Sequence, residues 1–213
     1  GQSEKRADQD VSLAVQNEVF AALIEEWRLS LPAVLAHDFG GATALRAYYL
    51  NKLRYASLTL IDPVALAPWG SPFVRHIRKH EAAFANMPDY MHDALLRVYL
   101  QGAAFNELDE EAFRIYMQPW QGDIGKPAFY RQIAQMGESY TDEISSSYQP
   151  MECPVQILWG ENDNWIPLSQ GRRLAEKLTG ERLTIVPGSG HLMQEDRPEA
   201  IVAAMMSDIV STV

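Results

Sequence analysis

Short apolar segments that alternate with helix-like segments constrain the fold of this chain more than any other feature. Buried strands are predicted at residues 33–37, 58–61, 155–159 and 183–186. Helices are predicted around them, at about 11–24, 40–53, 168–178 and from 198 onward. Strands that alternate with helices in this way predict a parallel sheet covered on both faces.

The stretch 64–150 interrupts this alternation. It is helix-like, rich in Tyr, Phe, Met and His, and broken by several prolines. Such a stretch between two core strands indicates a helical insertion that covers the sheet as a lid. We therefore predict a core formed by residues 1–65 and 151–213, and a helical cap at 66–150.

A titratable residue follows three of the predicted strands. Asp38 ends the first, Asp163 comes shortly after "VQILWG", and His191 comes after "LTIVPGSG". In an open parallel sheet, ligands bind beyond the carboxyl ends of the strands. The order along the chain is that of a nucleophile, an orienting acid and a base. We predict that these three side chains form a catalytic site.

The turn around Asp38 reads Ala36-His37-Asp38-Phe39-Gly40, followed by Gly41. A strained strand-to-helix turn that presents a nucleophile needs small neighbours, because the two backbones lie close together. The dipole of the following helix favours an anionic aspartate. Such an anion needs no base before it attacks a saturated carbon to form an ester. The alternative is that the aspartate only caps the helix.

These motifs resemble the α/β-hydrolase superfamily, in particular its aspartate-nucleophile members, the epoxide hydrolases and the haloalkane and haloacid dehalogenases. The matching segments are "HDFGG", "ILWGENDNWIP" and "VPGSGHLMQEDRPE". The resemblance implies an α/β-hydrolase fold, with a mostly parallel sheet flanked by helices and an inserted helical cap. The opening "GQSEK" resembles the end of the family's G-x-G-x-S loop, which implies that the N-terminal strands of the fold are absent from this chain.

The resemblance also implies a two-step hydrolysis. Asp38 attacks the substrate and forms an alkyl ester, and His191, oriented by Asp163, then activates the water that hydrolyses this ester. Asp62, at the end of the strand 58–61, is an alternative acid, because some dehalogenases carry their acid there. The other interpretation of this residue is a turn residue before Pro63.

Two residues favour an epoxide over a carbon–halogen substrate. Phe39 stands where haloalkane dehalogenases typically place a halide-holding Trp and fluoroacetate dehalogenases an Arg, and it has no side-chain donor. Tyr130, in "AFYRQIAQM", resembles the epoxide-hydrolase tyrosine that holds the epoxide oxygen, although a packed cap aromatic is an equal alternative. A second tyrosine is usual in that family, and the candidates are Tyr99, Tyr116 and Tyr140.

We expect Phe39, Trp69, Tyr130 and Trp165 to line a pocket for a small, mostly apolar organic substrate and water. Epoxide hydrolysis is the favoured activity. Dehalogenation of a haloalkane or haloacid and a general α/β-fold hydrolase activity are alternatives. A ligand-binding protein without turnover is the least favoured, since all three catalytic residue types are present.

Composition narrows the expected partners. A formal net charge of −10 argues against nucleic acid and anionic membranes, and no apolar run approaches the roughly 20 residues of a membrane span. The chain has no CxxC, HExxH or P-loop motif, so we expect no metal and no cofactor. Its single cysteine, Cys153, fits a reducing compartment, from which we expect a cytoplasmic protein. The sequence does not decide whether the protein forms a homodimer.

Overall fold

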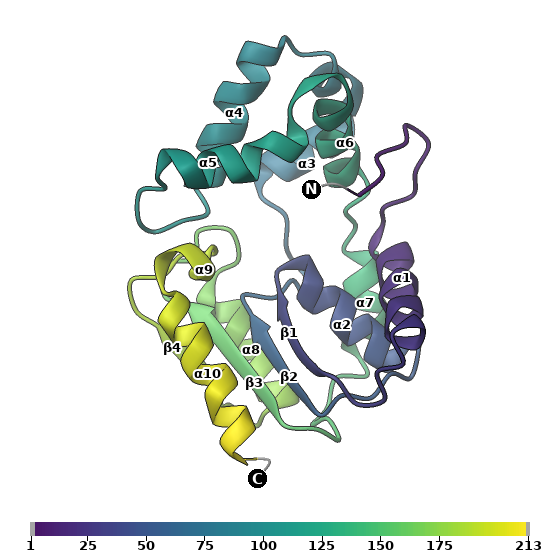
Figure 1. Cartoon of the computed structure of the whole chain (residues 1–213), viewed down its shortest axis with the longest axis vertical. Helices are drawn as coiled ribbons and strands as arrows, with labels where there is room; N and C mark the ends of the chain where they lie inside the picture. Colours follow the sequence, from purple (N-terminus) through teal and green to yellow (C-terminus); the bar gives the residue numbers. More distant parts are fainter. Residues whose placement is uncertain (1–2, 212–213) are drawn as a thin grey trace.

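The chain forms a parallel sheet with helices on both faces and a second helical layer beyond one end of the strands (Figure 1). This is a computed structural model, and it describes residues 3–211, with side-chain burial through residue 207. Within these residues the sheet has the spatial order β1-β2-β3-β4, and every neighbouring pair is parallel. The strands are β1 (Ala33–His37), β2 (Ser57–Ile61), β3 (Val155–Gly160) and β4 (Thr184–Val186).

Alternate side chains of the central strands enter two different clusters. Leu58 and Leu60 of β2 belong to a large cluster on one face of the sheet, whereas Ile61 belongs to a smaller cluster on the other. In β3, Trp159 joins the first cluster and Leu158 the second. Since successive side chains of a strand point to opposite faces, the continuous apolar runs of the sequence correspond to strands buried on both sides.

The core helices cover both faces of this sheet. Figure 1 shows α10 in front of the strands and α8 behind them, and α1, α2 and α7 pack together beside β1. The larger cluster receives side chains from α2, α7 and α8, and the smaller one from α9 and α10. The bounds are α1 (Leu13–Glu26), α2 (Phe39–Tyr49), α7 (Ser139–Ser145), α8 (Leu168–Leu178), α9 (Met193–Asp196) and α10 (Pro198–Ser211).

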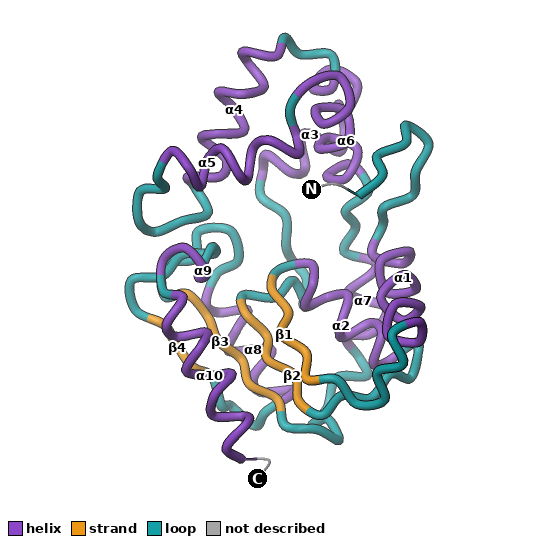
Figure 2. The backbone as a smooth tube through the Cα atoms, viewed as in Figure 1, coloured by secondary structure: helices purple, strands orange, loops and turns teal. Residues whose placement is uncertain are grey.

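The second layer, here called the cap layer, lies beyond the carboxyl ends of the strands and is joined to the core by long loops (Figure 2). It has an apolar cluster of its own, which includes Ile77, Leu96, Phe129 and Ile133. Its elements are α3 (Pro72–Ala85), α4 (Asp89–Gln101), α5 (Glu110–Met117), η1 (Gln118–Trp120) and α6 (Gly122–Ala134). The interval 66–150, predicted as the cap, therefore also contains α7, which packs in the core cluster through Ile144.

The sequence pattern placed the strands within one residue of their observed ends, and the helix at 168–178 coincides with α8. The helix predicted at 40–53 ends earlier, at Tyr49. Its last predicted turn is instead a loop in which Lys52 has a positive φ of 60°, a conformation that an α-helix excludes. The parallel sheet flanked by helices that the sequence predicts is thus confirmed within the described residues.

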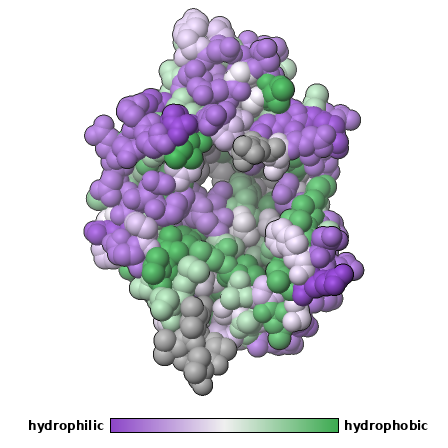
Figure 3. All heavy atoms as spheres, in the orientation of Figure 1, coloured by the Kyte–Doolittle hydropathy of each residue, from purple (hydrophilic) through white to green (hydrophobic). Residues whose placement is uncertain are grey.

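One edge of the sheet is open. Within residues 3–211, β1 pairs with β2 and with no strand on its other side, and the first residues of the "GQSEK" motif, Gly1 and Gln2, lie outside the described part. A groove of about 740 Å³ follows this edge between α1, β1, the start of α2 and α6. Figure 3 shows hydrophobic side chains gathered on the core half of the molecule and hydrophilic ones over most of the cap layer. Among the described helices we find none with the length and apolar character to cross a lipid bilayer.

Candidate active site

The turn between β1 and α2 holds Asp38 in a strained backbone conformation. Its φ is 51° and its ψ is −123°, a region that non-glycine residues rarely adopt. Backbone hydrogen bonds maintain this geometry: the Asp38 carbonyl accepts from the N–H of Gly41 at 3.0 Å and of Val64 at 3.1 Å. The side chain makes no capping hydrogen bond to the helix. No contact of the Asp38 side chain therefore supports the alternative, in which this residue caps the helix.

The small residues of this turn are not equivalent. A Cβ on Gly41 would lie 2.4 Å from the Cβ of Pro63, so the helix can approach the loop after β2 only without a side chain here. A Cβ on Gly40 would meet nothing within 4 Å. The expectation that small residues are needed in this motif thus holds for Gly41 and for the buried Ala36, but no crowding requires Gly40.

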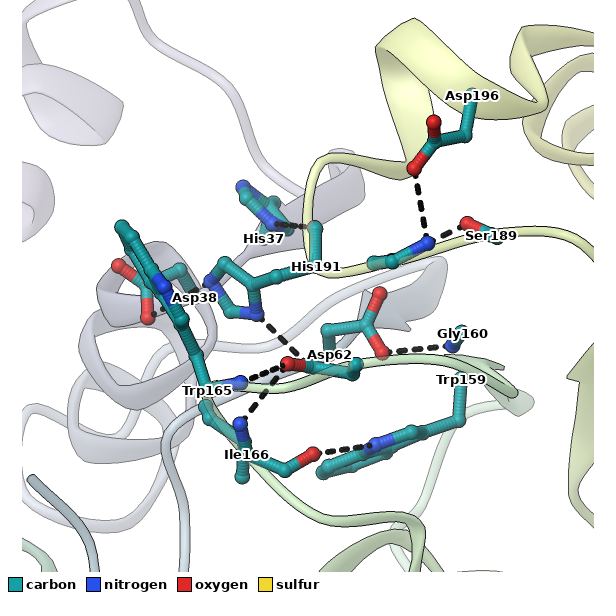
Figure 4. Close-up of polar contacts among 12 residues, drawn as sticks. His37, Asp38, Asp62, Trp159, Gly160, Trp165, Ile166, Ser189, His191 and Asp196 are labelled. Atoms are coloured by element: carbon teal, nitrogen blue, oxygen red, sulfur yellow. Dashed lines mark hydrogen bonds and ion pairs between the residues drawn. The ribbon is translucent and has the colours of Figure 1, made fainter. Parts of the chain in front are cut away.

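His191 lies between two carboxylates (Figure 4). Its Nδ1 donates to Oδ2 of Asp163 at 2.8 Å, and its Nε2 lies 3.4 Å from Oδ1 of Asp38. The second distance is long for a hydrogen bond, and Nε2 has no hydrogen-bond partner among the described residues. The histidine is thus anchored on Asp163 and presents Nε2 to Asp38.

Asp163 forms a hydrogen bond with the histidine, and among the described residues Asp62 forms none with it. Oδ1 of Asp163 accepts the backbone N–H groups of Trp165 at 2.7 Å and Ile166 at 2.9 Å, which leaves Oδ2 for His191. Oδ1 of Asp62 accepts the N–H of Gly160 at 2.8 Å, and its Oδ2 has no hydrogen-bond partner among the described residues. The geometry thus brings together the three residues predicted first and places the alternative acid beside them without a bond to the base.

These contacts shift the pKa values of the group. Burial alone would lower the pKa of His191, but its contacts with Asp163 and Asp38 outweigh this effect and raise it to about 10. Burial would raise the pKa of Asp38, yet its interaction with His191, the nearby His37 and the Phe39 N–H lower it overall. Burial, reinforced by the charge of Asp163, raises the pKa of Asp62 well above its usual range. At neutral pH the resting site therefore contains an anionic Asp38 beside a protonated His191.

Aromatic rings surround the histidine. The ring centroid of His191 lies 4.7 Å from that of His37 and 5.0 Å from that of Trp165, and Trp165 stacks on Tyr99 at 4.4 Å. Nε2 of His37 lies 2.8 Å from the backbone carbonyl of His191, to which it donates. His37 therefore supports the turn that carries His191 and does not contact the base through its imidazole nitrogens.

A small cavity of about 70 Å³ opens at Asp38. Three of the four residues predicted to line the substrate pocket do so: Phe39, Trp69 and Trp165. The indole N–H of Trp69 already donates to Oγ1 of Thr141 at 2.9 Å, whereas that of Trp165 makes no hydrogen bond within the described residues. The complete lining is Asp38, Phe39, Val64, Trp69, Gly70, Ser71, Val74, Tyr99, Met136, Trp165 and Ile166.

Tyr130, the fourth predicted pocket residue, lies elsewhere. It is fully buried inside the cap layer, where its hydroxyl is 2.8 Å from Nδ1 of His92. Nε2 of His92 donates to the carbonyl of Trp120 at 2.9 Å, so in the neutral imidazole Nδ1 is the acceptor and Tyr130 is the donor. The hydroxyl proton of Tyr130 is thus engaged within the cap layer. The contacts correspond to the alternative interpretation, a packed cap aromatic.

Of the other candidate tyrosines, only Tyr99 reaches the cavity. The hydroxyl of Tyr116 donates to Glu195 at 2.7 Å, and Tyr140 packs against the guanidinium of Arg46 outside the cavity lining. Tyr99 lines the cavity with Asp38, and its hydroxyl makes no hydrogen bond within the described residues. Burial and the charge of Asp38 raise the pKa of this phenol, so it carries its proton at neutral pH.

The described residues contain no group of three or more His, Cys, Asp or Glu side chains placed to hold a metal ion. One further acidic residue near the site was not singled out from the sequence. Asp196, five residues after His191, is buried and accepts the backbone N–H of Gly190 at 2.8 Å. The only signal for it in the sequence is its place in the His191 motif, "HLMQED".

Comparison with known proteins agrees with this arrangement. A family model described as the alpha/beta hydrolase family matches residues 4–204. A solved alpha/beta hydrolase fold protein from Burkholderia ambifaria is 52% identical with a TM-score of 0.95, over 97% of this chain and 76% of that one. Solved structures below 25% identity, among them a haloalkane dehalogenase, an epoxide hydrolase and an esterase, share the fold.

Curated relatives are more distant. The uncharacterized hydrolase YugF of Bacillus subtilis is 23% identical over 94% of this chain and 73% of its own length. Monoacylglycerol lipase abhd6-A of Xenopus laevis is 28% identical over 74% of this chain, which spans only 48% of the length of that lipase. Because the family model covers nearly the whole chain and the Burkholderia protein is similar throughout, the chain belongs to the alpha/beta hydrolase family.

Proposed function

We propose that this protein is a hydrolase that acts through a covalent ester on Asp38, with an epoxide as its substrate. The observation that carries the proposal is the geometry at Asp38: an anionic carboxylate on a strained turn, 3.4 Å from a histidine that is itself fixed by Asp163. A serine at this position would need His191 to remove its proton. A carboxylate with a lowered pKa is ready to attack without that step.

In the first step, Oδ of Asp38 attacks a ring carbon of the epoxide. A carbon–oxygen bond forms on Asp38, and the bond from that carbon to the epoxide oxygen breaks. The oxygen stays on the substrate as an alkoxide, which takes a proton from the hydroxyl of Tyr99. The free, protonated phenol of Tyr99 in the cavity supports this assignment, and it replaces Tyr130 as the proposed general acid.

The second step depends on the loss of the negative charge of Asp38 in the first step. Asp38 and Asp163 together hold the pKa of His191 at about 10, so the resting histidine is an imidazolium. Esterification makes Asp38 neutral and removes its contribution, which lowers the pKa of His191. The histidine then gives up its proton to the Tyr99 phenolate that the first step left, and can remove one from a water molecule. This water attacks the ester carbonyl, and the bond from that carbon to the alkyl oxygen breaks. The diol leaves with the proton of the new carboxyl group, so that Asp38 is again a carboxylate and His191 again an imidazolium.

The cavity supports a small substrate. Its volume of about 70 Å³ is well below the several hundred Å³ typical of sites for drug-sized ligands. Apolar side chains of Val64, Trp69, Val74 and Ile166 form much of its wall. We therefore propose a short-chain or otherwise small apolar epoxide, and larger substrates require displacement of the cap layer.

Dehalogenation is the second candidate, and one observation favours it. The indole N–H of Trp165 lines the cavity without a hydrogen-bond partner in the described part of the chain, and such a donor can hold a departing halide. Phe39 supplies no side-chain donor, and the N–H of Trp69 is bound to Thr141, so a single indole would carry this function. An epoxide remains the better fit, because Tyr99 offers a proton as well as a hydrogen bond.

The proposal is tested by trapping the ester. His191→Gln removes the base that activates water while leaving Asp38 free to react. Incubated with 1,2-epoxybutane or styrene oxide, this variant should gain the mass of one substrate on a peptide that contains Asp38, as measured by mass spectrometry. Asp38→Asn is the matched control and should gain no mass.

The outcomes separate the candidates. An adduct from 1-bromobutane but not from either epoxide would favour dehalogenation. Substrate consumption by His191→Gln without any adduct would indicate direct attack by water and contradict the covalent mechanism. Binding of these compounds to the wild-type protein without turnover or adduct would favour a ligand-binding protein.

A further inference from the structure

The turn that carries His191 is bound to the cap layer by one buried carboxylate. Oδ2 of Asp196 accepts the N–H of Gly190 at 2.8 Å and the N–H of Phe105 at 2.9 Å. Oδ1 accepts the N–H of Asn106 at 2.8 Å and its Nδ2 at 3.1 Å. Figure 4 shows Asp196 above the Ser189–His191 segment, on the side opposite Asp62. Four donors from two segments far apart in the sequence thus converge on one side chain.

Direct backbone contacts accompany this carboxylate. The N–H of Leu192 donates to the carbonyl of Ala103 at 3.1 Å, on the other side of His191 from Gly190. A Cβ on Gly190 would lie 2.7 Å from the Ala103 carbonyl and 2.8 Å from the Phe105 N–H. The turn and residues 103–106, which connect α4 to α5, are therefore in tight contact, with a glycine where the backbones meet.

We propose that Asp196 is a positioning residue that fixes the His191 turn to residues 103–106, so that the placement of His191 over Asp38 depends on the cap layer. This inference rests on the proposed function in one respect, since it takes His191 as the base of ester hydrolysis. Residues 103–106 directly follow α4, which carries Tyr99. The proposed general acid and the proposed base are thus held by one connected segment.

The consequence is a coupling between substrate entry and base position. Displacement of the cap layer to admit a substrate pulls on residues 103–106, and through Asp196 on the His191 turn. When the layer returns, Tyr99 and His191 are set in place together. Reaction geometry tolerates little error, because a misplacement of about 1 Å can cost about 10²-fold in rate.

The test substitutes Asp196→Asn. An amide turns one acceptor oxygen into a donor, and each oxygen of Asp196 now accepts two N–H groups, so either orientation of the amide loses two hydrogen bonds. We expect ester hydrolysis to slow by about 10- to 100-fold in single-turnover kinetics, and ester formation to slow less. Asp123→Asn, at an exposed position of α6, is the matched control and should change neither rate.

A second readout needs no substrate. The charges that raise the pKa of His191 are those of Asp38 and Asp163, so its titration reports the distances to them. In NMR titrations, Asp196→Asn should lower the pKa of His191, because a displaced ring interacts less with both carboxylates. Asp123→Asn should leave the titration as in the wild type.

Asn106→Ala keeps the test decisive if Asp196→Asn does not fold. This change removes the side-chain donor of an exposed residue, one of the four donors, and leaves the carboxylate in place. It should lower the pKa of His191 and slow ester hydrolysis, as Asp196→Asn does, but by a smaller amount. Folded Asp196→Asn protein with wild-type His191 titration and wild-type ester hydrolysis would overturn the proposal. If Asp196→Asn does not fold, Asn106→Ala protein with wild-type His191 titration and wild-type ester hydrolysis would also overturn the proposal. A shifted titration in a protein that forms no ester on Asp38 would support the positioning and contradict the proposed function.

Discussion

Asp62 and Asp163 follow neighbouring strands but have different contacts, and only Asp163 forms a hydrogen bond with His191. We expect Asp163→Asn to slow ester hydrolysis by roughly 10²-fold or more, since the base loses its orienting partner. Asp62→Asn retains an oxygen that can accept the Gly160 N–H and should leave the rate near that of the wild type. Single-turnover kinetics measures both, and the reverse ranking would assign the acid to Asp62.

Asp62 also makes stability depend on pH. Its pKa in the folded state is raised well above the usual 3.8, so the folded protein holds this proton more tightly than the unfolded chain does. The free energy of unfolding should therefore fall as the pH rises from about 4 towards the raised value. Asp62→Asn lacks this contribution and should be more stable than the wild type at the upper end of that window. Urea denaturation at several pH values measures the difference, and parallel curves for the two proteins would contradict it.

Two tyrosines of the cap layer separate a proton donor from a packing residue. Tyr99→Phe should slow ester formation from an epoxide by roughly 10²-fold or more, because the alkoxide loses its proton source. Tyr130→Phe removes a buried hydrogen bond to His92, and should cost about 1 kcal/mol of stability with little effect on ester formation. Single-turnover kinetics and thermal unfolding test the pair. A large kinetic loss in Tyr130→Phe alone would restore the assignment made from the sequence.

The comparison of these tyrosines shows where sequence reasoning stops. The convergence of Asp38, Asp163 and His191 could be predicted, because parallel strands bring their carboxyl ends to one edge of a sheet. No such rule governs the cap layer, where tertiary packing decides which phenol faces the cavity. The engagement of Tyr130 by His92 depends on contacts between α4 and α6 that sequence spacing does not specify.

Among the elements, the strands were predictable because each is a short apolar run bounded by turn residues, which is the pattern and length of a strand in a covered parallel sheet. The boundary of the cap was harder to predict from the sequence. Residues 139–145 are as helical as those before them, but α7 packs through Ile144 against the core rather than the cap layer. Helical periodicity indicates that a helix has a buried face, and it does not indicate what covers that face.

The turn between β1 and α2 allows a matched pair of substitutions. Gly41→Ala forces a Cβ to within 2.4 Å of Pro63, and should destabilise the fold by about 1–3 kcal/mol and displace Asp38. Gly40→Ala meets open space on a helix and should be neutral or slightly stabilising, because alanine costs less conformational entropy there. Thermal unfolding with activity assays tests both. Equal losses in the two variants would show that the whole turn, rather than one contact, requires glycine.

Within the described residues, the strand β1 forms one edge of the sheet, and this edge is where pairing with a second copy of the chain is expected. The outer side of β1 has no strand partner within residues 3–211, and Leu35 on this strand is 44% exposed. The segment that precedes β1 adds exposed apolar side chains, including Trp27 at 63% and Leu31 at 59%. An unpaired strand edge with apolar neighbours is a template for pairing with another chain. The chain of residues 1–213 should therefore self-associate in a concentration-dependent way.

A lysine on the edge strand tests this expectation, because a charge there opposes edge-to-edge pairing. Leu35→Lys should shift the chain towards the monomer in sedimentation-velocity experiments over a range of concentrations. Val202→Lys is the matched control: it places the same charge on α10, at a residue that is 58% exposed and outside the groove beside β1. If Val202→Lys abolishes association and Leu35→Lys does not, the exposed side of α10 is the contact surface. If the wild type remains monomeric at high concentration, the open edge of β1 is not a site of self-association, and its exposed apolar residues are tolerated without a partner copy.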